Sequence, residues 1–169
     1  MSIQYDVIIV GAGAAGMMSA IEAGKRGRKV LLVDHYKKIG EKIRISGGGR
    51  CNFTNINTNP SKFLSQNPKF VRSALSQYTQ NDFINLINKY EIKFHEKKLG
   101  QLFCDHSAQQ IVEMLLKECE LANVTILKEF IIKNIEKDND QYLVSTETDQ
   151  YSSESLIVAT GGLSVPKIG

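Results

Sequence analysis

Three glycines near the N-terminus have the spacing of a phosphate-binding turn. Residues 5–16 read Tyr-Asp-Val-Ile-Ile-Val-Gly-Ala-Gly-Ala-Ala-Gly. A glycine lets the backbone approach an anion closely because no Cβ blocks the way, and the N–H groups at the start of a helix attract negative charge. The sequence therefore predicts a pyrophosphate site formed by Gly11, Gly13, Ala14, Ala15 and Gly16.

An acidic residue follows at the distance expected for a ribose contact. Asp34 lies 23 positions after Gly11, and in dinucleotide sites an acid about 20 residues beyond the first glycines accepts hydrogen bonds from the ribose hydroxyls. The turn and the acid together predict a binding site for a dinucleotide. Their spacing alone leaves FAD and NAD open.

A strand, a helix and a second strand must position these residues. The apolar run before Gly11 predicts a buried strand, residues 14–23 show helical periodicity, and residues 29–33 predict a second buried strand that ends at Asp34. This order begins a Rossmann-like α/β fold with a parallel central sheet.

A second glycine-rich stretch could also contact the cofactor. Residues 40–55 read Gly-Glu-Lys-Ile-Arg-Ile-Ser-Gly-Gly-Gly-Arg-Cys-Asn-Phe-Thr-Asn, a composition that favours a loop over a helix or strand. Its cations could neutralise a pyrophosphate. The predicted cofactor-binding residues here are Lys42, Ser46, Gly47, Gly48, Gly49, Arg50, Cys51, Asn52 and Thr54. Lys37 and Lys38 are better explained as a solvated surface.

This stretch resembles the signature of a known family. It is similar to the pattern Gly-x-Lys…Ser-Gly-x-Gly-Arg-Cys-Asn-x-Thr-Asn of the aminoacetone-oxidase-like NAD(P)/FAD-dependent oxidoreductases, also called BaiN-type or YhiN-type flavoproteins. Residues 159–169 match a second element of that family, Ala-Thr-Gly-Gly-x-Ser-x-Pro-x-x-Gly. In residues 100–108 the match is weaker, because Gln101 and Cys104 replace an Arg and a Pro.

The resemblance implies a glutathione-reductase-type FAD-binding domain and selects FAD as the cofactor. It implies that Thr160, Gly161 and Gly162 approach the cofactor and that Ile132 meets the adenine through backbone atoms, with a core position as the alternative for Ile132. It also implies a flavoprotein oxidoreductase that acts on a small-molecule substrate, with NAD(P)H as a possible electron donor.

The remaining sequence predicts further elements of such a domain. Helices are expected at residues 67–78, 79–90 and 107–121, the last with a capping box of Ser107 and Gln110. A parallel strand is expected at 124–127 and a central strand at 156–159. Between them a β-meander is expected, with strands at 129–136, 141–147 and 151–153. Asp105 and His106 are adjacent and would point in opposite directions in an extended segment, so a role at the helix start is preferred over a catalytic pair.

The chain is expected to be one FAD-binding domain, residues 1–169, with a helical insertion at about 60–121. The resemblance covers only the first portion of the family's chain, so we expect the substrate domain to be absent from these residues. We therefore expect a truncated fragment that lacks the C-terminal half of the same protein and is inactive alone. No catalytic residue can be named.

Composition excludes several other classes. The net charge of +3 and the lack of a dense Lys/Arg run argue against nucleic acid. Three widely spaced cysteines indicate neither a disulfide framework nor a zinc site, and no metal is expected. The apolar N-terminus lacks the basic start of a signal peptide and contains Glu22, so no membrane association is expected and the cytoplasm fits best. The alternatives left open are a non-catalytic nucleotide-binding module and an NAD-linked dehydrogenase domain.

Overall fold

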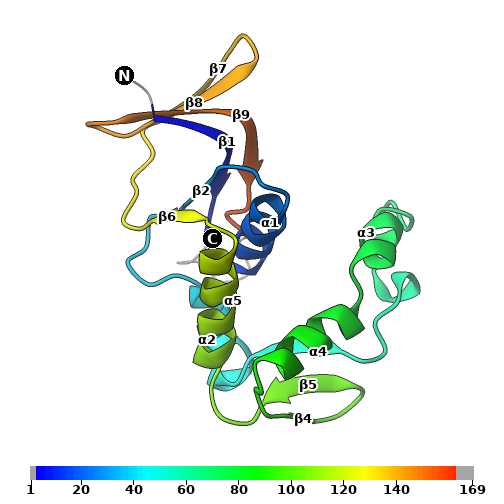
Figure 1. Cartoon of the computed structure of the whole chain (residues 1–169). Coiled ribbons are helices and arrows are strands. Elements are labelled where there is room, and N and C mark those ends of the chain that lie inside the picture. The colour runs from blue at the N-terminus through cyan, green and yellow to red at the C-terminus, as the bar shows by residue number, and fades with distance from the viewer. Residues whose placement is uncertain (1–2, 163–169) are drawn as a thin grey trace. The chain divides into compact units, whose positions relative to one another are not determined.

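The computed structural model describes residues 3–162 (Figure 1). The chain divides into two compact units. The first unit comprises Met1–Ile43 and Val112–Gly169, and the second comprises Arg44–Ile111. We describe each unit by itself.

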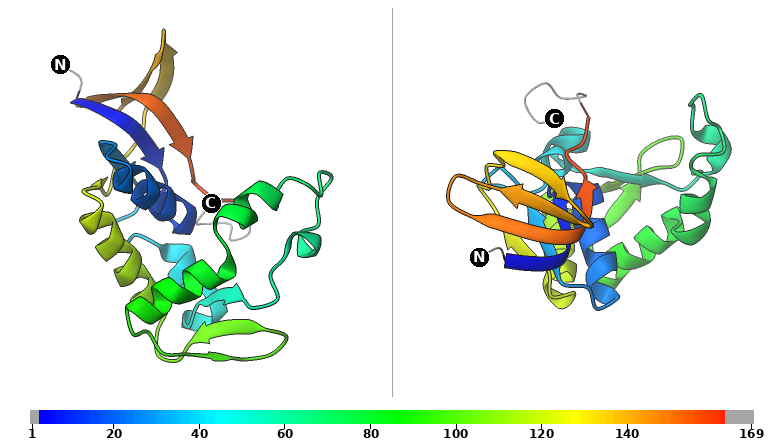
Figure 2. Two further views of the ribbon diagram at one scale, coloured as in Figure 1. Left: turned by 45° about the vertical axis from the view of Figure 1, so that its right-hand side comes forward. Right: turned by 90° about the horizontal axis from the view of Figure 1, so that it is seen from above.

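The first unit is built on a six-stranded sheet with the order β6-β2-β1-β9-β8-β7 (Figures 1 and 2). Strands β6, β2, β1 and β9 pair in parallel, and β9, β8 and β7 pair in antiparallel fashion. The predicted Rossmann-like fold with a parallel central sheet and a β-meander is therefore confirmed. The strands are β1 (Ile3–Val10), β2 (Val30–Val33), β6 (Thr125–Leu127), β7 (Asn134–Asp138), β8 (Gln141–Ser145) and β9 (Gln150–Val158).

The core of this unit follows from the apolar strands. All four residues of β2 are buried, as are Ile8 and Ile9 in the centre of β1. Strands buried on both faces are expected where helices cover a parallel sheet. Helix α1 (Ala14–Lys25) buries Met17, Ala20 and Ile21, as the helical periodicity predicted.

Helix α5 (Gln109–Leu121) begins in the second unit and ends in the first. Ala122, the residue after its last turn, lies close to α1, because a Cβ on Gly24 would lie 2.3 Å from the Ala122 carbonyl oxygen. The predicted capping box is only half formed. The Ser107 hydroxyl accepts a hydrogen bond from the Gln109 nitrogen at 3.1 Å, whereas the side-chain oxygen of Gln110 is buried without a partner.

The last strand of the predicted meander and the last central strand are one element, so their separation was wrong. Strand β9 runs unbroken from Gln150 to Val158. It pairs with β1 from Tyr151↔Ile3 to Val158↔Val10, and its first part also pairs with β8. The polar residues 152–155 suggested a break, but pairing on the β1 side continues through them.

The second unit combines short helices with a three-stranded sheet of order β3-β5-β4. Phe53 and Phe94 pack edge to face on this sheet, with ring centroids 5.4 Å apart. Helix α2 (Glu41–Ile45) leads into this unit. Its other elements are the 3-10 turns η1 (Ser46–Gly49) and η2 (Pro60–Lys62), the helices α3 (Arg72–Gln77) and α4 (Gln80–Lys89), and the strands β3 (Asn52–Asn55), β4 (Phe94–Glu96) and β5 (Gln101–Cys104).

Two predictions in this unit were wrong in part. Residues 40–55 are not one loop, because α2 and β3 flank the glycines, and Asn52–Asn55 gain backbone partners in β5. Helix α3 starts at Arg72 and not at residue 67, since the residues after Asn67 form turns. Helix α4 agrees with the prediction and begins with a capping box of Thr79 and Asp82.

None of the helices in the described part of the chain is both long enough and apolar enough to span a bilayer.

Candidate functional site

Gly11 sits where the ends of three parallel strands meet. Its amide nitrogen donates to the Val33 carbonyl at 2.8 Å, and the Ala159 nitrogen donates to the Val10 carbonyl at 2.8 Å. Gly11 has φ +101°, and a Cβ there would lie 2.6 Å from the Ala159 oxygen. Only glycine allows the chain to turn here so close to the end of β9.

Gly16 and Gly13 serve this turn in different ways. A Cβ on Gly16 would lie 1.8 Å from the Gly11 oxygen, so this glycine is required for the helix to pack behind the turn. Gly13 is the N-cap of α1, and no atom lies within 4 Å of the place where its Cβ would be. The fold does not need a glycine at this position, but an approaching anion would.

Asp34, at the end of β2, points its carboxylate at the same turn. Its two oxygens accept from the Ala12 nitrogen at 2.7 Å and from the Tyr36 nitrogen at 2.9 Å. A carboxylate offers about four lone-pair sites, so two remain for ribose hydroxyls. A glycine turn, a helix N-terminus and this acid together fit the ribose and pyrophosphate of a dinucleotide.

Lys42 and the turn after β9 also belong to this cluster. The Lys42 ammonium group donates to the Gly162 carbonyl, and a Cβ on Gly161, which has φ +84°, would lie 3.2 Å from the Lys42 nitrogen. The Thr160 Cα would lie 2.9 Å from a Cβ on Gly11. The structure thus brings Lys42, Thr160, Gly161 and Gly162 together with the glycine turn. The rest of the predicted Ala-Thr-Gly-Gly element, residues 163–169, lies outside the described residues.

The Ser46–Gly49 turn has a conformation that its glycines explain within the second unit. Gly47 and Gly48 have φ of 58° and 68°, and a Cβ on Gly47 would lie 2.7 Å from the Phe103 ring. The Gly49 carbonyl accepts from the Ala108 nitrogen at 2.7 Å. The predicted cofactor contacts of Ser46, Gly47, Gly48, Gly49, Arg50, Cys51, Asn52 and Thr54 stay predictions.

Ile132 packs against the core of the first unit. The cluster that it joins includes Tyr5, Leu31, Phe130 and Tyr151. Its side chain therefore has the core position that was the alternative interpretation. The predicted backbone contact with adenine is compatible with this position and stays a prediction.

Two buried thiols lie close together in the second unit, which the sequence spacing did not indicate. Burial, together with the nearby Cys51, raises the pKa of Cys104 to about 12. Burial also raises the pKa of Cys51, although a hydrogen bond with Ser46 opposes this. The antiparallel pairing of β3 with β5 brings them together, and no local sequence pattern reports such a pairing. Both are free thiols.

His95 pairs with Asp105, which corrects the expected role of Asp105 at a helix start. The His95 Nδ1 and the Asp105 Oδ1 are 2.7 Å apart, and the Asp105 nitrogen donates to the Lys93 carbonyl at 2.9 Å. The two residues meet because β4 and β5 are neighbouring antiparallel strands. Only the tertiary pairing could identify His95 as the partner.

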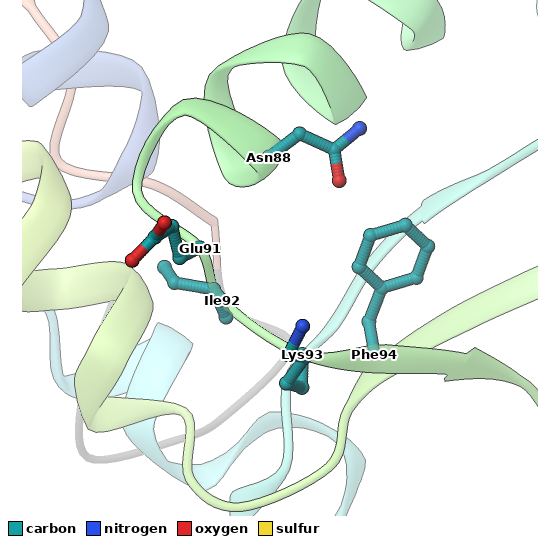
Figure 3. A pocket seen from close by; sticks show the side chains of 5 residues that line it. All are labelled: Asn88, Glu91, Ile92, Lys93 and Phe94. Atoms are coloured by element: carbon teal, nitrogen blue, oxygen red, sulfur yellow. The ribbon is translucent and has the colours of Figure 1, made fainter.

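A pocket of 460 Å³ lies in the second unit, between the end of α4 and the start of β4. Asn88 and Phe94 face each other across it (Figure 3). Its other lining residues are Glu91, Ile92 and Lys93. None of the five belongs to the predicted cofactor site. In residues 3–162, no three His, Cys, Asp or Glu side chains gather as a metal site would require.

Comparison with known proteins agrees with the geometry of the glycine turn. Residues 5–169 match the family described as "HI0933-like protein Rossmann domain". The "Ribosomal RNA dihydrouridine synthase" of Escherichia coli K12 is 53% identical over 98% of this chain and 42% of its own length. The protein of the same name from Haemophilus influenzae is 49% identical over 100% of this chain and 43% of its own length. The chain thus spans about two fifths of these relatives.

A more distant relative is the "3-dehydro-bile acid delta(4,6)-reductase" of Clostridium scindens, 24% identical over 95% of this chain and 40% of its own length. Among solved structures, thioredoxin reductase of Streptococcus pyogenes has a TM-score of 0.55 at 20% identity and covers 95% of this chain and 36% of its own. The halogenase PltM, solved with phloroglucinol and FAD, has a TM-score of 0.55 at 19% identity and covers 92% of this chain and 34% of its own. The chain belongs to the HI0933-like family and has the Rossmann-like fold of the FAD-binding domain of flavoprotein oxidoreductases.

Proposed function

We propose that the chain binds FAD at the glycine turn and that the whole protein reduces a carbon–carbon double bond of uridine in ribosomal RNA. The observation that supports FAD binding is the joint position of Gly13 and Asp34. The space beside Gly13 is open, and the Asp34 carboxylate is held at the same turn by the Ala12 nitrogen.

Each group of the turn has a defined role in this proposal. The N-terminus of α1 attracts the pyrophosphate, the Asp34 carboxylate accepts from the ribose, and Lys42 fixes the turn after β9 through the Gly162 carbonyl. The cofactor contacts of Ser46–Gly49 and its neighbours remain predictions from the sequence. Bound flavin supplies hydride chemistry that no side chain can perform.

The proposed substrate rests on the names of the relatives. Two relatives about half identical to this chain are named for dihydrouridine synthesis in ribosomal RNA, and a third is named as a Δ(4,6)-reductase of a 3-oxo bile acid. Both names describe the addition of two hydrogens to a double bond conjugated with a carbonyl. One hydride and one proton are added, and NAD(P)H is the proposed source of the hydride.

This substrate departs from the expectation that nucleic acid is not a partner. That expectation rested on the charge of the whole chain, and the structure does not test it. The small-molecule alternative, closer to the aminoacetone-oxidase-like and BaiN-type members of the resembled family, is favoured by the bile-acid relative alone, at lower identity.

Two measurements test the proposal. In calorimetry, the chain should bind FAD more tightly than NADH; a preference for NADH would contradict the assigned cofactor. The whole protein to which the chain belongs should restore dihydrouridine, measured by mass spectrometry, to the ribosomal RNA of an Escherichia coli strain that lacks the 53% identical relative. If the chain binds FAD but the whole protein forms no dihydrouridine, the proposed substrate is wrong and the proposed cofactor stands. Turnover of an unsaturated 3-oxo steroid acid would then favour the small-molecule alternative.

A further inference from the structure

The charge of the chain is unevenly divided between its two units. Residues 44–111 contain nine Lys and Arg against four Asp and Glu, a net charge of +5. The rest of the chain contains twelve Lys and Arg against fourteen Asp and Glu, a net charge of −2. The modest charge of the whole chain therefore hides a basic second unit.

The absence of acids is most marked in one continuous stretch. No Asp or Glu occurs between Glu41 and Asp82. Within it, residues 57–79 run out from β3 and return into α4 (Figure 2). None of these residues is buried, and all of 61–70 are exposed. This segment contains Lys62, Lys69 and Arg72 and no acid that could neutralise them locally.

Exposed apolar side chains alternate with these cations. Lys62 precedes Phe63, which is 42% exposed, and Lys69 precedes Phe70, which is 77% exposed. Leu64 is 97% exposed. Exposed aromatic rings beside cations are the groups on which unpaired bases stack while the cations contact the phosphates. Asn59 and Asn67, which accept hydrogen bonds within their own turns, keep the backbone beside these cations in tight bends.

We propose that residues 57–79 bind single-stranded RNA, with Phe63 and Phe70 stacking on unpaired bases while Lys62, Lys69 and Arg72 contact phosphates. Proteins recognise single-stranded RNA through this combination of stacked aromatic rings and cations. The proposal rests on the proposed function, because it assigns the ribosomal RNA substrate to a surface of this chain.

The charge of this surface favours RNA over a second protein or a lipid surface. A covering protein domain would have to bring its own acids to neutralise three cations, whereas RNA carries one negative charge on every phosphate. A lipid surface usually takes a long amphipathic helix, and the only α-helix within the segment, α3, has six residues.

The test measures binding of a fluorescein-labelled poly(U) oligonucleotide by anisotropy over a range of salt concentrations. The double variant F63A/F70A should bind about tenfold more weakly per lost stacking contact. The triple variant K62Q/K69Q/R72Q should bind more weakly and lower the slope of log affinity against log salt by about 2. The matched control R28Q/K117Q/K128Q removes three exposed cations from the first unit and should bind as the wild type does.

FAD binding of every variant shows that the first unit is folded, and circular dichroism checks the rest. If both second-unit variants bind poly(U) like the wild type, the inference is wrong. Wild-type chain that binds phosphatidylserine vesicles but not poly(U) would also overturn it.

The whole protein separates this inference from the proposed function. If the wild type forms dihydrouridine and both second-unit variants form it equally well at limiting RNA, the inference fails and the proposed function stands. If the wild type forms no dihydrouridine, the proposed function fails. Weaker poly(U) binding by the two second-unit variants would in that case support RNA binding by residues 57–79 without the proposed reaction.

Discussion

The Asp34 carboxylate accepts a hydrogen bond of 2.7 Å from the backbone nitrogen of Ala12, 22 residues earlier in the chain. The bond joins the end of β2 to the glycine turn after β1, so the acid shapes the turn even without a nucleotide. One carboxylate thus has two functions: it fixes the turn, and it presents its remaining lone pairs for ribose.

Replacing Asp34 by Asn should separate these two functions. The amide oxygen can still accept from the Ala12 nitrogen, whereas the amide nitrogen cannot accept from the Tyr36 nitrogen. The charge that strengthens ribose hydrogen bonds is also lost. Because hydrogen bonds to a charged group contribute about 1.5–3 kcal/mol, FAD affinity should fall roughly 10- to 150-fold. Calorimetric titration with FAD measures the change.

Asp6 offers a matched control for Asp34. Its Oδ2 accepts from the Lys29 nitrogen at 2.7 Å and ties β1 to the residue before β2, at the other end of this strand pair. Asp6→Asn should therefore weaken a comparable structural bond and leave FAD affinity unchanged. An equal loss of affinity in both variants would show that Asp34 acts only through the fold.

Gly13 should tolerate substitution in the fold but not in the binding of FAD. Its φ of −82° suits any residue, and the space beside it is open. Gly13→Asp supplies a favourable N-cap residue, so stability should hold or rise by a few tenths of a kcal/mol. FAD binding should be lost because the side chain occupies the position of the pyrophosphate. The isosteric Gly13→Asn variant separates bulk from charge, and tight FAD binding by both would contradict the site.

Gly16→Ala should show the opposite pattern. The added Cβ would lie 1.8 Å from the Gly11 oxygen, which is backbone and cannot move aside without changing the turn. We expect a lower urea midpoint for unfolding, with weaker FAD binding as a consequence of the damaged turn. A Gly16→Ala protein as stable as the wild type would contradict the close packing of α1 on the turn.

The elements of the first unit could be predicted because their signals are local. The apolar run of β1, the periodicity of α1 and the position of Asp34 all lie within one strand–helix–strand unit, and β1, β2 and α1 appear where they were expected. Strand β9 was divided in error because the polar residues 152–155 lack a local strand signal. Their pairing with β1 depends on residues about 150 positions away in the chain.

The second unit was harder to predict because its contacts are tertiary. His95 meets Asp105 through the antiparallel register of β4 with β5, and Cys51 lies near Cys104 through the register of β3 with β5. The sequences of isolated short strands do not reveal these registers. The charge of residues 44–111 was visible in the sequence, but averaging it over the whole chain concealed it.

The capping box of α4 should make the second unit sensitive to acid. The Asp82 carboxylate accepts from the Thr79 nitrogen and hydroxyl, both at 2.7 Å, and these bonds lower the pKa of Asp82. A carboxyl group whose pKa is lower in the folded than in the unfolded chain stabilises the fold above its unfolded pKa. This stabilisation is lost as the pH falls through the folded pKa.

Thr79→Ala should therefore lower the urea midpoint at neutral pH, with a smaller difference from the wild type in acid. Circular dichroism at a series of pH values measures both. Ser76→Ala is the control, because the Ser76 hydroxyl donates only to the Ser73 carbonyl in α3. A Thr79→Ala deficit that stays constant into acid would rule out the link to Asp82.

The buried thiols should make the protein sensitive to alkali. Burial, with a smaller contribution from Glu118, raises the pKa of Cys119 to about 12. Burial also raises the pKa of Cys104 to about 12. A thiol whose pKa is higher in the folded than in the unfolded chain stabilises the fold fully below the unfolded pKa of about 9. This stabilisation is lost as the pH rises toward the folded pKa. Over that window each such thiol should reduce the free energy of unfolding by up to about 1.4 kcal/mol per pH unit.

Cys119→Ala isolates this effect in the first unit. The Cys119 side chain is fully buried, with its sulfur 3.8 Å from the Met17 carbonyl, so the variant should be less stable at neutral pH because packing is lost. Its stability should then fall less steeply than that of the wild type above about pH 9, because one buried proton no longer has to dissociate. Urea unfolding at several alkaline pH values gives both slopes. Parallel slopes would mean that Cys119 ionises equally easily in the folded and unfolded chain, which its burial on α5 beside the Met17 carbonyl of α1 does not allow.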